Sequence, residues 1–135
     1  MGRHIVVVDD DRDIREALQE ALVQRGYEVT VAPNGLKLIA ALEVDKPDLV
    51  VLDVMMSWID GLALCRAMKR NESYQDIPVL FVSGRGSPTD IQEGLSCGAA
   101  GYMVKPFSLS SFLDRVQEIA GPPNAPATQT APPPS

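Results

Sequence analysis

Four short apolar runs in this chain each lead into polar side chains that could do chemistry together. The runs and their polar ends are Ile5 to Val8 with Asp9 and Asp10, Leu49 to Leu52 with Asp53, Val79 to Val82 with Ser83, and Tyr102 to Val104 with Lys105. If these runs are parallel strands, their carboxyl ends meet at one edge of a sheet. Three carboxylates and one ammonium would then share that edge.

Such a group of carboxylates is the kind of site that a divalent cation stabilises. Like charges that are crowded together raise each other's pKa unless a positive charge joins them. Mg²⁺ prefers hard oxygen ligands and is usually held by one or two carboxylates with waters and phosphate oxygens. We expect Asp9 and Asp10 to serve as ligands, with Asp10 the more direct one, because Asp11 directly precedes a helical pattern and should cap that helix. The residues therefore predict Mg²⁺ as a cofactor and phosphoryl chemistry as its use.

Apolar runs alternate with amphipathic stretches along the chain, and this alternation predicts five βα units. The predicted strands cover residues 4–8, 28–31, 48–53, 78–82 and 101–104, and the predicted helices cover residues 12–25, 35–43, 62–70, 89–97 and 109–120. Continuous β-branched runs such as Ile5 to Val8 are typical of parallel strands that are covered on both faces. The expected fold is therefore α/β, a doubly wound parallel sheet in a three-layer sandwich.

Composition restricts the class of protein further. The chain has 135 residues, of which 45% are apolar and 22% are charged, as in an ordinary globular domain. A formal charge of −6 argues against direct nucleic-acid binding, and the chain lacks the roughly 18 apolar residues in a row that a membrane span needs. Cys65 and Cys97 lie in helical patterns without CxxC spacing, so we expect buried, reduced thiols in a cytoplasmic protein.

The composition changes abruptly after Gly121. Residues Pro122 to Ser135 include six prolines among fourteen residues, with no charge and no large apolar side chain. Such a segment cannot bury enough surface to offset the entropy lost on ordering it. We therefore expect one domain over residues 1–121, followed over residues 122–135 by a Pro-rich disordered tail or a truncated linker.

Five segments in order resemble those of a bacterial two-component response-regulator receiver domain of the chemotaxis-receiver kind. They are VVVDDD at Val6 to Asp11, DLVVLDVMM at Asp48 to Met56, IDG at Ile59 to Gly61, PVLFVSG at Pro78 to Gly84 and GYMVKPF at Gly101 to Phe107. The resemblance covers residues 4–121 and implies a flavodoxin-like fold with strand order 2-1-3-4-5. In one departure from the receiver pattern, Ser57 stands at the position four residues after Asp53 where a proline is usual, and Trp58 comes next.

The resemblance also implies a role for each residue at the sheet edge. Asp53 would be the phosphoacceptor, Ser83 would hydrogen-bond the phosphoryl group, and Lys105 would contact another of its oxygens. Tyr102 would act with Ser83 as a switch by changing its rotamer. Mg²⁺ would be held by Asp9, Asp10, Asp53 and the backbone carbonyl of Met55.

These roles imply a signalling phosphoacceptor rather than an enzyme, although one that assists its own phosphorylation and dephosphorylation. Its phosphodonor would be a histidine kinase or a phosphotransfer protein. Its phosphorylated form would act on an unknown downstream protein or output domain through the face formed by residues 88–120, because those elements follow the two switch residues.

Other classes of function compete with this interpretation. A pseudo-receiver would be an interaction module that never uses the site, but the full set of acidic, hydroxyl and lysine residues argues against it. A phosphatase or phosphotransferase with an aspartyl nucleophile commonly has its general acid two residues further on, whereas Asp53 is followed by Val54 and Met55. A dinucleotide-binding enzyme is weaker still, because the turn after the first run lacks G-x-G-x-x-G.

Overall fold

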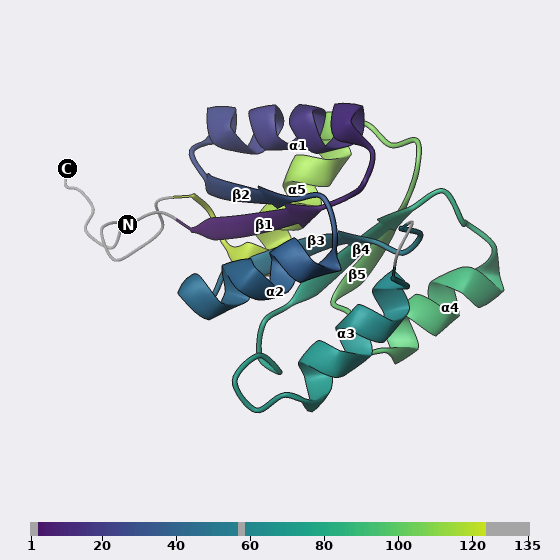
Figure 1. Ribbon diagram of the computed structural model, residues 1–135. Helices are drawn as coiled ribbons and strands as arrows, with labels where there is room; N and C mark the ends of the chain where they lie inside the picture. Colours follow the sequence, from purple (N-terminus) through teal and green to yellow (C-terminus); the bar gives the residue numbers. More distant parts are fainter. Residues whose placement is uncertain (1–2, 57–58, 124–135) are drawn as a thin grey trace.

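The computed structural model describes residues 3–56 and 59–123 (Figure 1). Ser57, Trp58 and residues 124–135 of the expected tail lie outside the described residues. The strands are β1 His4–Val8, β2 Glu28–Ala32, β3 Leu49–Asp53, β4 Val79–Ser83 and β5 Gly101–Val104, and the helices are α1 Arg12–Arg25, α2 Gly35–Val44, α3 Gly61–Arg70, α4 Pro88–Ser96 and α5 Leu109–Ala120. The predicted elements are confirmed, and no end differs from its prediction by more than one residue.

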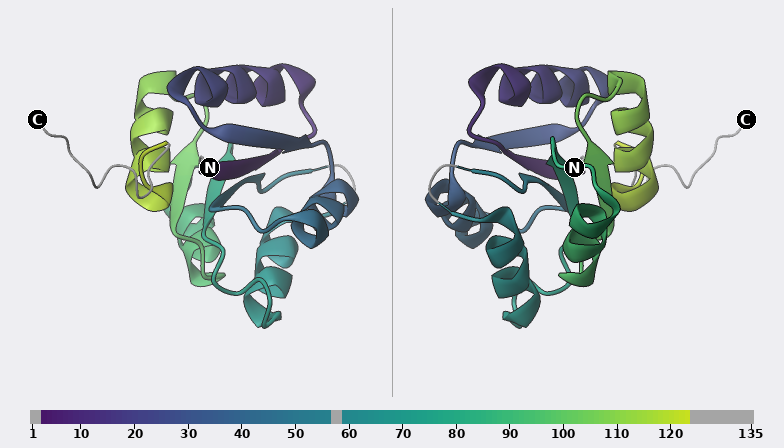
Figure 2. Two further views of the ribbon diagram at one scale, coloured as in Figure 1. Left: turned by 90° about the vertical axis from the view of Figure 1, so that its left-hand side faces the viewer. Right: turned by 90° about the vertical axis from the view of Figure 1, so that its right-hand side faces the viewer.

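All five strands are parallel and form one sheet in the order β2-β1-β3-β4-β5. Helices α1 and α5 cover one face of the sheet, and α2, α3 and α4 cover the other (Figure 2). The chain therefore has the predicted α/β fold, a doubly wound three-layer sandwich with flavodoxin-like strand order.

The alternation of side chains along β1 shows why an unbroken apolar run suits this sheet. Ile5 and Val7 pack in the core beneath α1 and α5, whereas Val6 and Val8 pack in the core beneath α2 and α3. All four side chains are fully buried. A strand covered on both faces needs apolar residues at every position, which removes the polar alternation of a half-exposed strand.

Caps fix where the helices begin. The side chain of Asp11 accepts hydrogen bonds from the backbone N–H groups of Asp13 and Ile14, so it is the N-cap of α1 as predicted. Ser87 plays the same part for α4 by accepting from Asp90 N at 3.1 Å, which is why α4 begins at Pro88, one residue before its predicted start. Because Asp11 is used as a cap, only Asp9 and Asp10 of the acidic run remain for the sheet edge.

Three smaller features complete the fold, and the first of them was expected from the sequence. Cys65 and Cys97 are buried and free, and burial raises the pKa of the Cys65 thiol to about 11. The peptide bond between Lys105 and Pro106 is cis. Among the helices of residues 3–56 and 59–123, none combines the length and the apolar content needed to cross a membrane.

Two leucines of α2 test how much the core contributes to stability. Leu38 is fully buried, whereas Leu36 is 79% exposed. We expect Leu38→Ala to lower the free energy of unfolding by about 2–5 kcal/mol, because it removes buried methyl groups and leaves a cavity. Leu36→Ala should change it by less than about 0.5 kcal/mol. Urea denaturation of both variants checks this, and equal losses would contradict the assignment of the core face.

Candidate functional site

Polar side chains from four strand ends meet at one edge of the sheet. Asp9 and Asp10 follow β1, Asp53 ends β3, Ser83 ends β4, and Lys105 follows β5. Strand β3 lies between β1 and β4, and β5 lies beside β4. Since all the strands run in the same direction, their carboxyl ends bring these residues together, as the sequence predicted.

Three carboxylates form the centre of this group. Oxygen atoms of Asp9, Asp10 and Asp53 lie within 4.8 Å of one another. Asp9 is fully buried and Asp53 is 6% exposed, whereas Asp10 is exposed. Hard oxygen donors at this spacing suit a divalent cation such as Mg²⁺, and the exposed position of Asp10 leaves one side of the group in contact with solvent.

Lys105 supplies the positive charge that the two buried carboxylates need. Its Nζ lies 3.0 Å from Oδ2 of Asp9 and 3.4 Å from Oδ2 of Asp53. Burial lowers the pKa of Lys105, but the hydrogen bond to Asp9 and the charge of Asp53 outweigh that effect and raise the pKa above its usual value. The lysine is therefore charged and held between the two carboxylates.

The environment of Asp53 makes its ionised form costly. Burial and, next, the charge of Asp9 raise the pKa of Asp53 to about 6, although the backbone N–H of Met55 and the ammonium of Lys105 act in the opposite direction. The Met55 N–H donates to Oδ1 of Asp53 at 3.0 Å. One ammonium is thus too little to balance the carboxylates, and a bound cation would restore the balance.

Backbone contacts fix Asp9 in place. Its Oδ1 accepts from the N–H of Asp11 at 2.9 Å, and its backbone carbonyl accepts from Nη1 of Arg15 at 2.9 Å. Together with the Lys105 ammonium on Oδ2, these contacts hold the whole residue. Arg15 was missed by the sequence analysis, because an arginine on the polar side of a helical pattern carries no signal of such a contact.

Gly61 packs directly against the backbone of Asp53. A β-carbon at Gly61 would collide with the carbonyl oxygen of Asp53 and with Cα of Val54. The N–H of Gly61 also donates to the Val54 carbonyl at 2.9 Å. Gly61 of the IDG segment therefore lies tightly against the end of the strand that carries Asp53.

Ser83 and Tyr102 are connected through the backbone of one loop residue. Ser83 is fully buried, and its Oγ accepts from the N–H of Arg85 at 3.1 Å. The hydroxyl of Tyr102 donates to the Arg85 carbonyl at 2.7 Å. The exposed Arg85 side chain donates from its Nε to Sδ of Met55 at 3.0 Å. The part played by Arg85 had no signal in the sequence analysis.

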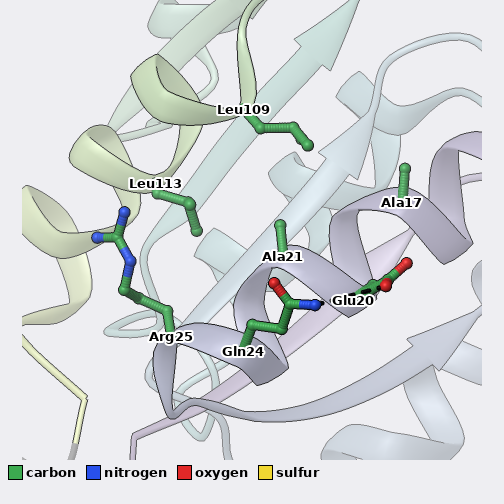
Figure 3. A pocket seen from close by; sticks show the side chains of 7 residues that line it. All are labelled: Ala17, Glu20, Ala21, Gln24, Arg25, Leu109 and Leu113. Atoms are coloured by element: carbon green, nitrogen blue, oxygen red, sulfur yellow. Dashed lines mark hydrogen bonds between the residues drawn. The ribbon is translucent and has the colours of Figure 1, made fainter.

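Two hollows between α1 and α5 lead up to the site. The larger, of about 520 Å³, is lined by Ala17, Glu20, Ala21, Gln24, Arg25, Leu109 and Leu113 (Figure 3). The smaller, of about 240 Å³, includes Lys105 and shares Ala17 and Leu109 with the first. The two hollows are therefore neighbours, and we refer to them together as the α1–α5 groove, part of whose wall is the site lysine.

Comparisons with known proteins agree with this geometry. The sequence model of the family described as "Response regulator receiver domain" matches residues 5–117. The curated "Response regulator MprA" of Mycobacterium tuberculosis is 40% identical over 119 residues, which cover 88% of this chain and 51% of that protein. The protein of the same name from Mycolicibacterium vanbaalenii is 41% identical with the same coverage. The chain thus spans about half the length of the curated relatives it matches.

Solved structures show the same architecture. The chemotaxis protein CheY4 of Vibrio cholerae superposes with a TM-score of 0.83 at 30% identity, covering 88% of this chain and 99% of that one. A putative response regulator from Chloroflexus aurantiacus gives a TM-score of 0.84 at 29% identity, covering 89% and 98%.

The raised pKa of Asp53 predicts an unusual effect of removing its charge. Because the folded protein holds the Asp53 proton more tightly than the unfolded chain does, the stability of the wild type should fall as the pH rises from the ordinary value of 3.8 through about 6. Asp53→Asn has no carboxyl group at this position to ionise, so its stability should not show this fall with rising pH. In buffer without divalent cations, the variant should therefore be more stable than the wild type at neutral pH, and the difference should shrink on acidification.

Urea denaturation at several pH values measures this difference. Asp114→Asn, which removes an exposed carboxylate of α5, is the matched control and should leave stability nearly unchanged at every pH. An Asp53→Asn variant that is less stable than the wild type at neutral pH would contradict the electrostatic description of the site.

Proposed function

This chain belongs to the response regulator receiver domain family of two-component systems, and from that premise we propose that it is a phosphoacceptor module. Asp53 takes a phosphoryl group from a histidine kinase or a phosphotransfer protein. The modified domain then acts on a downstream protein or output domain. The single observation that carries the proposal is the buried Asp53 carboxylate, placed between the Lys105 ammonium and two further carboxylates.

The chemistry of transfer follows from these neighbours. A carboxylate oxygen of Asp53 attacks the phosphorus of the donor, and the electrons of the broken bond leave with the donor's nitrogen. Lys105, which already lies 3.4 Å from Oδ2 of Asp53, is placed to neutralise a phosphoryl oxygen. Positioning and charge neutralisation supply most of the catalysis in such reactions, so the domain assists its own phosphorylation and also the later hydrolysis of the phosphorylated Asp53 by water.

Mg²⁺ is the cofactor that the acidic group fits. Asp9, Asp10 and Asp53 would hold it with the backbone carbonyl of Met55, and the ion would neutralise oxygens of the phosphoryl group. The fit rests on the donor set itself, which is all oxygen, carries three charges and has one side exposed.

The response to phosphorylation would pass through Ser83 and Tyr102. A phosphoryl group adds charge and acceptor oxygens, and the Ser83 hydroxyl can donate to one of them. Since the Arg85 backbone contacts both Ser83 and the Tyr102 hydroxyl, a shift of Ser83 reaches Tyr102 by that route. Phosphorylation shifts an equilibrium between two arrangements that the unmodified protein already visits.

Two surfaces suit the two kinds of partner. Lys105 is part of the wall of the α1–α5 groove, so a phosphodonor bound there would reach Asp53. Outside the groove, the face of residues 88–120 exposes apolar side chains on α4 and β5, which are Leu95 and Val104. We assign the groove to the phosphodonor and the face of residues 88–120 to the downstream partner.

Phosphoryl uptake tests the proposal directly. Incubation with a small acyl phosphate and Mg²⁺ should add the mass of one phosphoryl group to the wild type. Asp53→Asn should take up none, because the nucleophile is gone. Asp10→Asn should weaken Mg²⁺ binding by roughly tenfold or more and slow the uptake without abolishing it. Asp114→Asn is again the control, and undiminished labelling of Asp53→Asn would sink the assignment.

Ser83→Ala separates phosphorylation from the response to it. The variant should still accept a phosphoryl group on Asp53, because the nucleophile and Lys105 are intact, but the amide shifts of residues 88–120 on phosphorylation should shrink. Backbone NMR with and without a phosphoryl mimic measures these shifts. If the wild type responds only around Asp9, Asp53 and Lys105, the domain is a passive phosphate carrier and the switch is wrong.

A further inference from the structure

Gly94 of α4 lies against the ring of Tyr102 with no room for a side chain between them. A β-carbon built on Gly94 would lie 2.7 Å from Cδ2 and 2.8 Å from Cε2 of Tyr102, and 3.3 Å from Cδ2 of Phe81. Carbon atoms in ordinary contact are about 3.5–4.0 Å apart. The ring of Tyr102 therefore occupies space that only a glycine at position 94 leaves open.

The backbone of α4 does not itself require a glycine at this position. The glycines with positive φ among the described residues are Gly26, Gly98 and Gly121, so Gly94 has a conformation that alanine adopts readily. Glycine in the interior of a helix is less stable than alanine. The contact with the Tyr102 ring supplies the missing reason for the residue.

The place beside Gly94 is also where Tyr102 connects to Ser83. With the ring there, the Tyr102 hydroxyl donates to the Arg85 carbonyl at 2.7 Å, and Arg85 N donates to Ser83 Oγ at 3.1 Å. The ring lies 6.0 Å from Phe81, centroid to centroid, in a tilted pair. A ring that turned away about χ1 would lose the bond to Arg85.

We propose that Gly94 is a positioning residue for Tyr102, which keeps open the slot that the ring needs to reach Arg85. The proposal rests on the proposed function, because it concerns how phosphorylation of Asp53 is read at α4 and β5. A β-carbon at position 94 would displace the rigid ring. Because Tyr102 is only half-buried, its side chain can relieve the clash by rotating about χ1. The balance between the two ring positions is thereby set by α4.

Coupling between sites is reciprocal, so the slot also works in the opposite direction. A partner that moves α4 toward β5 narrows the slot and expels the ring, and the loss of the Tyr102 bond then releases Arg85 beside Ser83. Binding at α4 would in this way alter the site at Asp53 through Tyr102, Arg85 and Ser83.

The test compares Gly94→Ala with Gly84→Ala. A β-carbon at Gly84 would meet nothing within 4 Å, so the second variant makes the same chemical change in open space. In the unmodified wild type and in Gly84→Ala, NMR should show contacts between the Tyr102 ring protons and the α-protons of residue 94. Gly94→Ala should lose these contacts and also the hydrogen bond that the Tyr102 hydroxyl donates to the Arg85 carbonyl. Their retention would overturn the proposal.

A double-variant cycle shows whether the effect acts through the ring. With beryllium fluoride and Mg²⁺ as the phosphoryl mimic, Gly94→Ala should lose most of the amide shifts in α4 and β5. In a Tyr102→Ala background, the same substitution should cause no further loss. A further loss of equal size would mean that Gly94 acts on the helix itself and would overturn the proposal. The double variant has no ring for the new β-carbon to clash with. If Gly94→Ala alone folds poorly, recovery of folding in the double variant would show that the clash with the ring was the cause.

Mass measurement keeps this inference separate from the proposed function. Gly94→Ala should still gain one phosphoryl group from a small acyl phosphate, at whatever rate, because the Asp53 nucleophile, Lys105 and the acidic group are intact. If the wild type gains none, the proposed function fails. The ring contacts in the unmodified protein still decide the role of Gly94 in that case.

Discussion

Two buried carboxylates sharing one ammonium determine how this domain is built. Asp9 is fully buried, Asp53 nearly so, and Lys105 bridges them at 3.0 and 3.4 Å. Without Lys105, the two carboxylates would be buried with no counter-charge, which is strongly unfavourable. The three side chains must therefore stay together, and they come from strands that are distant in sequence. The sheet order, the cap at Asp11 and the close packing of Gly61 against Asp53 all help to hold these strand ends in place.

The same arrangement explains why the site favours a further positive charge. Because the pKa of Asp53 is raised to about 6, its ionised form is stabilised by any positive charge that is added beside it, such as a bound cation. Neighbouring residues limit the motion of the group: the N–H groups of Met55 and Asp11 hold one oxygen of Asp53 and one of Asp9. Backbone N–H groups thus orient the carboxylates of Asp53 and Asp9, and the excess negative charge favours the binding of a cation beside them.

The sequence predicted the elements and the meeting of the strand ends, because continuous apolar runs and their polar ends are local patterns that the parallel topology turns into one edge. It predicted the cap at Asp11 for the same local reason. It did not predict the contacts of Arg15 or Arg85, or the fit of Tyr102 against Gly94, since these depend on where α1, α4 and the loop after β4 come to lie in space. A glycine inside a helical pattern shows that something needs room, but only the packed structure shows what.

The position of Lys105 near the end of the domain has a consequence for how the protein is made. A ribosome releases Asp9 first, Asp53 later and the lysine that neutralises both of them last. Until Lys105 has been added, Asp9 and Asp53 have no ammonium between them. A chain that ends before β5 therefore contains both carboxylates but lacks the ammonium that bridges them.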